Sequence, residues 1–421
     1  MPGTPPSFPN TPNCNCAAYG SLTFLLAVTM SSPFINFHRP SIGREEIEAV
    51  HRVLESGWLT TGPVAQQFEK EFAAYLGCKH ALAVNSATAA LHLAMDVIDL
   101  RPGDEVIVPT YTFTASAEVV TYMGATPVLC DSKQGGFNLD PADVERRISP
   151  RTRAIMAVHV AGEAADLGTL RDLALRRGLH LVEDAAHSLP ASFAGKRVGA
   201  SSELAAFSFY ATKTITTGEG GMFTTNNDAY AQRAHIMRLH GISGDAWKRY
   251  TSHGNWYYEV VEAGFKMNMP DILAALGIAQ LRKADAFHLR RCQIAAAYAD
   301  CFSGLEEVEL PPATDDIHSW HLFMIRLRSE MLEKNRNEFI AELKRAGIGT
   351  SVHFIPLHLH PYYRDRYLYR PGDFPNAEDA YSRAISLPIY PDLTDDEVQR
   401  VADSVQRVAR ASRRRVFTGA A

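Results

Sequence analysis

The sequence predicts an α/β protein: a large domain built on a mixed, mostly parallel seven-stranded sheet, followed by a smaller C-terminal α+β domain. Two observations predict this class. Short β-rich runs alternate with amphipathic segments, and apolar strands separated by helices are typical of a parallel sheet covered on both faces. The 421 residues are also too many for one compact core, which indicates two domains.

Seven runs are the expected strands of the large sheet. Each is about five residues long and rich in apolar, β-branched or aromatic residues. No helical segment separates the last two runs, so one of them can run antiparallel to the rest. The expected strands are 80–84, 105–109, 126–130, 154–158, 180–184, 205–209 and 221–225.

A long helical pattern over 269–302 leads out of this region. After it, the run 320–327 and the helical patterns that follow predict the smaller domain. Thr394 is a good N-cap for a last helix with acidic residues in its first turn. The expected domains are therefore a disordered leader at 1–30, a large domain at 31–283 and a small domain at 284–421.

Composition excludes several classes of protein. The net charge of −5 gives no basic field for nucleic acid, and the 46% hydrophobic and 21% charged residues are ordinary for a soluble protein. The six cysteines are scattered, without a CxxC pair, which favours free thiols in a reducing compartment and thus the cytoplasm.

The first 30 residues are rich in Pro, Asn and small residues, a composition that predicts disorder. The apolar run 22–28 is too short to span a bilayer. No Lys or Arg precedes Arg39, so a secretory signal is not expected either. A translation start at Met30 would explain this leader as non-structural, and we expect no membrane association.

Polar and aromatic residues follow several expected strands, and ligands of open α/β sheets bind at those carboxyl ends. Ser86, Ala87 and Thr88 follow 80–84 and open a helix, which suits an anion such as phosphate, although a simple cap explains them equally. Phe113 follows 105–109 and could stack on a flat ring or belong to the core.

Two further stretches carry ionisable groups at strand ends. Asp184 ends the apolar strand 180–184 and needs a cationic or N–H partner, or caps a helix; His187 lies one turn further on. Ser208 lies in the strand 205–209, and Lys213 follows among small residues that leave room for a planar cofactor. A neutral lysine attacks carbonyls, although a surface lysine is the simpler interpretation.

Together these stretches match the needs of pyridoxal 5′-phosphate (PLP): an amine, an acid facing the ring nitrogen, a phosphate cup and an aromatic lid. No GxGxxG motif follows a strand, and GEGG lacks the GK[ST] of a Walker loop. His353, His358 and His360 fit no strong zinc pattern, so no metal site is expected.

At these motifs the sequence resembles the DegT/DnrJ/StrS family of sugar aminotransferases, within the fold-type-I PLP enzymes. The resemblance runs from about residue 36 to about residue 410. It rests on ESGWLTTGP, NSATAALHLA, GDEVIVPTYTF, VEDAAHS, FSFYATKTITTGEGG, FKMNMPDILAALGIAQL, SVHFIPLHLHPYY and SLPIYPDLT.

The resemblance implies a role for each matching residue of the PLP-binding large domain. Lys213 would link to the cofactor and carry the proton, and Asp184 would pair with the pyridine nitrogen. His187, where the family often has Gln, would approach the ring's 3-hydroxyl. The remaining contacts would be Phe113 stacked on the ring and Ala87, Thr88 and Ser208 on the phosphate.

Two more roles concern the partner subunit and the substrate. Asn268 would reach the phosphate of the neighbouring subunit's cofactor, which implies a homodimer with shared active sites, and His358 would lie near the sugar. The loop 215–221, ITTGEGG, resembles members that aminate C4 of a 4-keto nucleotide sugar. The aromatic stretch 244–264 would stack on the nucleotide base or pack against the partner.

The resemblance implies that an amino group is transferred from glutamate to a nucleotide-linked 4-keto-6-deoxy sugar. The expected acceptor is the keto group at C4 of that sugar. A keto-cyclitol acceptor is an alternative within the same fold. A PLP-binding regulator without turnover is the alternative from another class, although the lysine, the acid and the phosphate cup are all retained. Dehydratase relatives carry histidine in place of the lysine, whereas Lys213 is present.

Overall fold

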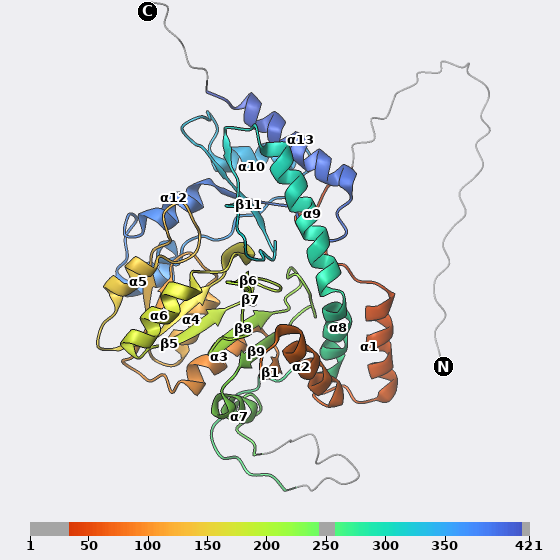
Figure 1. Ribbon diagram of the computed structural model, residues 1–421, viewed down its shortest axis with the longest axis vertical. Helices are drawn as coiled ribbons and strands as arrows, with labels where there is room; N and C mark the ends of the chain where they lie inside the picture. The colour runs from red at the N-terminus through yellow and green to blue at the C-terminus, as the bar shows by residue number, and fades with distance from the viewer. Residues whose placement is uncertain (1–32, 244–256, 415–421) are drawn as a thin grey trace, which may run out of the picture. The chain divides into compact units, whose positions relative to one another are not determined.

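The computed structural model describes residues 33–243 and 257–414 (Figure 1). The leader predicted for 1–30 and most of the stretch 244–264 lie outside the described residues. The chain from Phe34 onward forms one compact unit.

A seven-stranded sheet forms the base of this unit, in the order β1-β9-β8-β5-β4-β2-β3. The strand β9 is antiparallel to both neighbours and every other pairing is parallel, which confirms the mixed, mostly parallel sheet. Two strands differ slightly from the predicted ranges, since β4 starts two residues earlier and β8 one. The strands are β1 His80–Val84, β2 Glu105–Pro109, β3 Thr126–Cys130, β4 Thr152–Val158, β5 His180–Asp184, β8 Leu204–Ser208 and β9 Gly221–Thr225, with a separate hairpin of β6 Ser192–Phe193 and β7 Lys196–Arg197.

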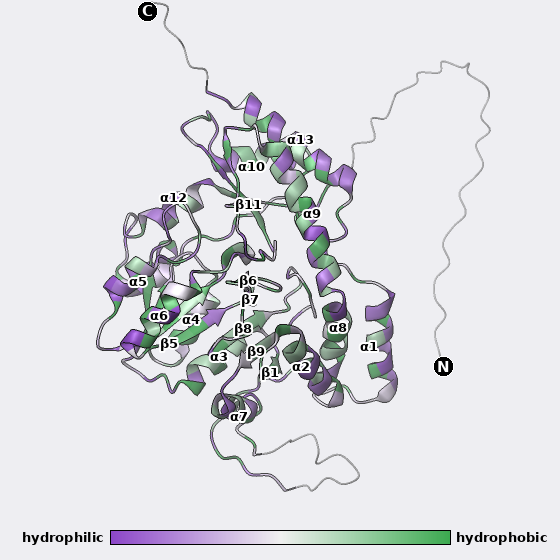
Figure 2. Cartoon of the chain, in the orientation of Figure 1, coloured by the Kyte–Doolittle hydropathy of each residue, from purple (hydrophilic) through white to green (hydrophobic). Residues whose placement is uncertain are grey.

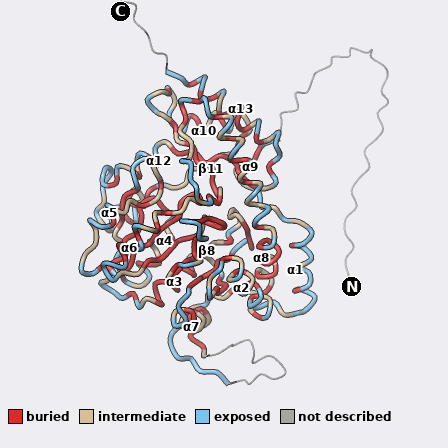
Figure 3. The backbone as a smooth tube through the Cα atoms, in the orientation of Figure 1, coloured by how far each residue is buried: buried red, intermediate tan, exposed pale blue. Residues whose placement is uncertain are grey.

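Helices cover both faces of the large sheet, because successive strand residues point to opposite sides. In β1, for example, Leu82 and Val84 join one apolar core, whereas Ala81 and Ala83 join the other. The strands are accordingly hydrophobic and buried (Figures 2 and 3). The first core includes α3 Ala87–Val97, α4 Ala115–Tyr122 and α7 Asp228–Met237; the second includes α2 Pro63–Leu76, α5 Pro141–Arg147, α6 Leu167–Arg177 and α8 Asp271–Arg282, beside which α1 Arg44–Ser56 packs.

A second, three-stranded antiparallel sheet follows in the chain, in the order β10-β11-β12. Thr394 caps the last helix through a capping box with Glu397, as predicted. The helical pattern 269–302 is two helices separated at Lys283; the predicted domain boundary falls at this break and stays a prediction. These elements are α9 Ala284–Phe302, β10 Val308–Glu309, β11 Phe323–Leu327, α10 Arg336–Arg345, α11 Pro361–Tyr367, α12 Pro375–Arg383, β12 Ala384–Leu387 and α13 Asp395–Ala411.

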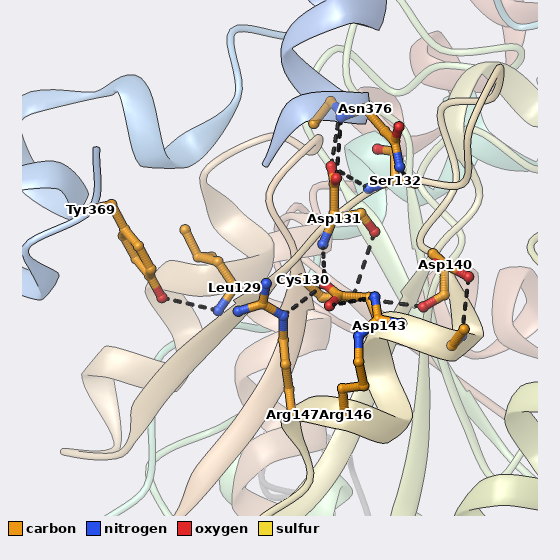
Figure 4. A network of polar contacts seen from close by, with 12 residues as sticks. Leu129, Cys130, Asp131, Ser132, Asp140, Asp143, Arg146, Arg147, Tyr369 and Asn376 are labelled. Carbon is orange, nitrogen blue, oxygen red and sulfur yellow. Dashed lines mark hydrogen bonds and ion pairs between the residues drawn. The ribbon is translucent and has the colours of Figure 1, made fainter. Parts of the chain in front are cut away.

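A buried carboxylate fixes the end of β3 to the start of α12 (Figure 4). Asp131 accepts hydrogen bonds from the backbone N–H groups of Asn376 at 3.1 Å and Ala377 at 2.9 Å, at the positive end of the α12 dipole. Asp143 of α5 in turn accepts the N–H of Asp131 at 2.8 Å. Hydrogen bonds that satisfy these buried polar groups thus join the end of β3 to α5 and to the start of α12.

Across the described ranges, 33–243 and 257–414, no helix is both long enough and apolar enough to cross a membrane.

Candidate active site

A cavity of about 480 Å³ lies at the carboxyl ends of the large sheet's strands. Residues that follow β1, β2, β5 and β8 all line it, as expected for an open α/β sheet. The structure brings seven of the nine predicted site residues together around this cavity. They are Ala87, Thr88, Phe113, Asp184, His187, Ser208 and Lys213.

Lys213 is half-buried in the turn that follows β8, where its backbone N–H bonds the carbonyl of Tyr210 at 2.9 Å. Burial lowers the pKa of its amine to about 8, and the charge of Asp184 partly opposes that fall. Near neutral pH the uncharged, nucleophilic form is therefore far more abundant than for an ordinary lysine.

Asp184 is buried, with 6% of its surface exposed, at the end of β5. Its Oδ2 accepts the hydroxyl of Ser116 at 2.7 Å, and its Oδ1 accepts the N–H of Ala186 at 3.2 Å. The carboxylate is thus held at both oxygens and has the unshared electron pairs needed to accept a ligand N–H.

His187 stands beside two other cavity histidines, His321 and His353. Its Nδ1 accepts the N–H of Ala161 at 3.3 Å, so the neutral ring carries its proton on Nε2. Burial, and then the nearby charge of Lys213, lower the pKa of His187 well below its usual value, and burial lowers that of His353 to about 4. These rings can donate hydrogen bonds without adding charge.

The N-terminus of α3 lines the cavity through Ser86, Ala87 and Thr88, and a helix start of this kind suits an anion. The first N–H groups of a helix, here at Ala87 and Thr88, have no acceptor within the helix. The Ser86 hydroxyl caps the N–H of Ala89 at 3.1 Å, and Ser208 adds a second hydroxyl to the wall. A Cβ on Gly221 would lie 2.4–2.6 Å from backbone atoms of Ser86 and Ala87, so only glycine allows β9 to approach this helix start.

Phe113 stands at the mouth of the cavity with 60% of its surface exposed. Its ring centroid lies 6.3 Å from that of Phe354, which also lines the cavity. Its exposure leaves the Phe113 side chain accessible to a ligand in the cavity.

Two predicted residues do not line the cavity. His358 is fully buried, and its ring bonds the Thr110 hydroxyl at 2.7 Å and the Glu378 carboxylate at 2.9 Å, so it ties the end of β2 to α12. Asn268 donates to the Thr61 hydroxyl at 2.6 Å and accepts from Lys266 at 2.5 Å.

Sequence reasoning did not assign several residues that line the cavity. Tyr210, Thr212 and Glu219 belong to the same stretch as Lys213. Their closeness to Lys213 in the sequence could have indicated that they line the same site. His321 and Phe354 come from segments next to the second sheet, so only the tertiary structure reveals them. Among the described residues, no cluster of three or more His, Cys, Asp or Glu could hold a metal ion.

The cavity suits PLP in its donor set: a partly neutral lysine, a carboxylate, a helix N-terminus with two hydroxyls, and an exposed aromatic ring. A Cβ at Gly221 would lie 2.6 Å from the Ala87 nitrogen, so the absence of a side chain there leaves the space beside that N–H unfilled. The fold and the cavity therefore define a fold-type-I PLP-dependent enzyme.

The model of the DegT/DnrJ/EryC1/StrS aminotransferase family matches residues 40–406, and the chain belongs to this family. The chain is 47% identical over 381 residues to "Uncharacterized protein MJ1066" of Methanocaldococcus jannaschii, covering 90% of this chain and 99% of that relative. It is 45% identical to spore coat polysaccharide biosynthesis protein SpsC of Bacillus subtilis, over 90% of this chain and 98% of that protein.

Solved structures agree. A candidate sugar aminotransferase from Streptococcus pneumoniae, Spr1654 in its PMP form, superposes with a TM-score of 0.84 at 34% identity, covering 90% of this chain and 99% of that one. DesV of S. venezuelae, in complex with a ketimine intermediate, gives 0.79 at 38% identity, covering 88% and 95%. The chain is a PLP-dependent sugar aminotransferase of this family.

The lowered pKa of Lys213 can be measured directly in the apo-protein. Competitive acetylation across a pH series, read by peptide mass spectrometry, should give Lys213 a midpoint near 8, about two units below ordinary lysines. Because Asp184 raises this pKa, Asp184→Asn should move the midpoint to lower pH. A midpoint near 10, or an upward move in the variant, would contradict this electrostatic description.

Proposed function

We propose that the protein transfers an amino group from glutamate to a keto group, at C4, of a nucleotide-linked 4-keto-6-deoxy sugar. The observation that carries the proposal is the position of Lys213, with its lowered pKa, in one cavity with Asp184 and the free N-terminus of α3. The scattered thiols, four of which are free in the described part of the chain, support a cytoplasmic enzyme.

When bound, PLP supplies an electron sink for the carbon that carries the transferred nitrogen. Lys213 is the proton carrier in this proposal, since its amine alternates between neutral and charged forms near the working pH. In each half-reaction its Nζ would carry a proton between the substrate carbon that bears the nitrogen and the C4′ carbon of the cofactor.

Six residues would hold the cofactor in this proposal. Asp184 would face the ring nitrogen and keep it protonated, and the neutral Nε2–H of His187 would donate to the ring's 3-oxygen. Phe113 covers the ring face, while Ala87, Thr88 and Ser208 bind the phosphate.

The names of relatives support a sugar acceptor. Helicobacter pylori PseC, an aminotransferase involved in the biosynthesis of pseudoaminic acid, is 30% identical with a TM-score of 0.83, covering 90% of this chain and 100% of that one. The cavity volume lies within the range of small-molecule sites. The loop 215–221, which resembles C4-aminating members, borders this cavity through Glu219 and Gly220.

We further propose a homodimer in which Asn268 reaches the cofactor phosphate of the partner subunit. Asn268 bridges to Val84, at the end of β1 and next to the α3 segment, but does not line its own cavity. In a dimer with shared sites, Asn268 lies beside the phosphate-binding residues of its own chain but contacts the cofactor phosphate bound by the partner subunit.

His353, on the cavity wall, is a better candidate than His358 for contact with the sugar.

The keto-cyclitol acceptor remains the alternative within this fold, and the PLP-binding regulator is the alternative from another class. The keto-cyclitol alternative differs from our proposal only in the acceptor. The regulator alternative predicts that PLP binds tightly without turnover, although a proton-carrying lysine would then have no use.

Glutamate should bleach the visible absorption of the PLP-loaded protein, and a keto-sugar acceptor should restore it. A panel of UDP-, dTDP- and GDP-linked 4-keto-6-deoxy sugars, 3-keto sugars and keto-inositols is offered with 15N-labelled glutamate. Mass spectrometry should show a 15N-labelled C4 amine on a nucleotide-linked sugar. Lys213→Ala should lose turnover by several orders of magnitude. A labelled cyclitol alone would favour the alternative acceptor, and no transfer to any compound would favour the regulator.

Mixing two variants that each impair activity tests the shared site. Asn268→Ala should lower activity about tenfold or more through a lost phosphate contact. A one-to-one mixture of Lys213→Ala and Asn268→Ala, after subunit exchange, should regain about a quarter of wild-type activity, because half the dimers carry one intact site. Activity no greater than the mean of the two variants would show that each site is complete within one chain.

A further inference from the structure

A carboxylate is useful opposite a ring nitrogen only if its orientation is fixed. The two residues that follow Asp184, Ala185 and Ala186, have no polar side chains that could hold it. Its constraint therefore comes from two hydrogen bonds, from the Ala186 N–H and from the Ser116 hydroxyl. The second is the shorter, at 2.7 Å, and comes from a different element, α4, on one face of the sheet (Figure 1).

Ser116 has no exposed surface and does not line the cavity. Its Oγ lies between two oxygens, 2.7 Å from Asp184 Oδ2 and 2.8 Å from Thr112 Oγ1. An ionised carboxylate can only accept, so the Ser116 hydroxyl donates to Asp184. The Ser116 oxygen is then free to accept, and Thr112 donates to it. The direction of both bonds follows from the charge of Asp184.

A serine inside a helix often returns its hydroxyl to the carbonyl four residues earlier. Ser116 instead bonds the Thr112 hydroxyl and a carboxylate 68 positions away. Thr112, Ser116 and Asp184 expose 1%, 0% and 6% of their surfaces, so water competes little for these bonds. A charge-assisted bond in such surroundings is among the stronger hydrogen bonds in proteins.

We propose that Thr112 and Ser116 are a positioning pair that holds the Asp184 carboxylate toward the ring nitrogen of PLP. The inference rests on the proposed role of Asp184. Ser116 acts only through that carboxylate. Thr112, which itself lines the cavity, acts on the carboxylate through Ser116. Without the Ser116 hydroxyl, Asp184 keeps one restraint, its carboxylate turns more freely, and the ring nitrogen is protonated less completely.

The test is the protonation of the ring nitrogen in holoenzyme loaded with ring-15N PLP, followed by 15N NMR across a pH series. Ser116→Ala should lower the pKa of that nitrogen by about one unit, a tenfold change in its protonation equilibrium. Thr112→Val, which keeps the side-chain shape, should give a smaller shift of the same sign. The matched control is Ser188→Ala, because Ser188 is equally buried and its hydroxyl has no hydrogen-bond partner among the described residues.

Two results would overturn the inference. A titration of Ser116→Ala and Thr112→Val identical to that of Ser188→Ala would leave these hydroxyls with a packing role alone. An upward shift would show that Ser116 only weakens the basicity of Asp184. Asp184→Asn separates the two proposals: if it too leaves the signal unchanged, the role of Asp184 itself fails, whereas a change there with none in Ser116→Ala removes the positioning pair alone.

Discussion

The active site depends on one lysine amine that is withdrawn from water while a carboxylate faces the same cavity. Burial favours the neutral amine, and Asp184 limits that preference, so the pKa of Lys213 lies at about 8 rather than above 10. Nearby His187, His321 and His353 have lowered pKa values and are uncharged at neutral pH. They bring hydrogen-bonding groups close to Lys213 without further lowering its pKa through positive charge.

The second sheet contributes to this cavity through the segment that leads into β11. Ser319 N–H donates to the Gly162 carbonyl at 3.1 Å, and its hydroxyl donates to the His187 carbonyl at 2.5 Å. A Cβ on Gly162 would lie 1.9 Å from Ser319 Oγ, so this contact requires glycine. Together with Asp131 at α12, these bonds fix one wall of the cavity to the large sheet.

The sequence predicts the large sheet well because a buried parallel strand is a short apolar run that needs no distant partner to be seen. It likewise indicates Lys213, Asp184 and Ala87, since each ends or follows such a run and the strand ends meet at one edge. It does not indicate the partners of His358, because Thr110 and Glu378 are far away in the chain. His321 and Phe354 reach the cavity only through the docking of the second sheet, and Ser116 is one of many helical serines until Asp184 is placed beside it.

The central claim is that the amine of Lys213 is the group that holds the cofactor aldehyde. Borohydride reduction of the PLP-loaded protein, followed by proteolysis and mass spectrometry, tests it most directly. The account predicts a single peptide that carries reduced PLP on Lys213, and none in Lys213→Ala. A label on another lysine, or on no lysine at all, would contradict it.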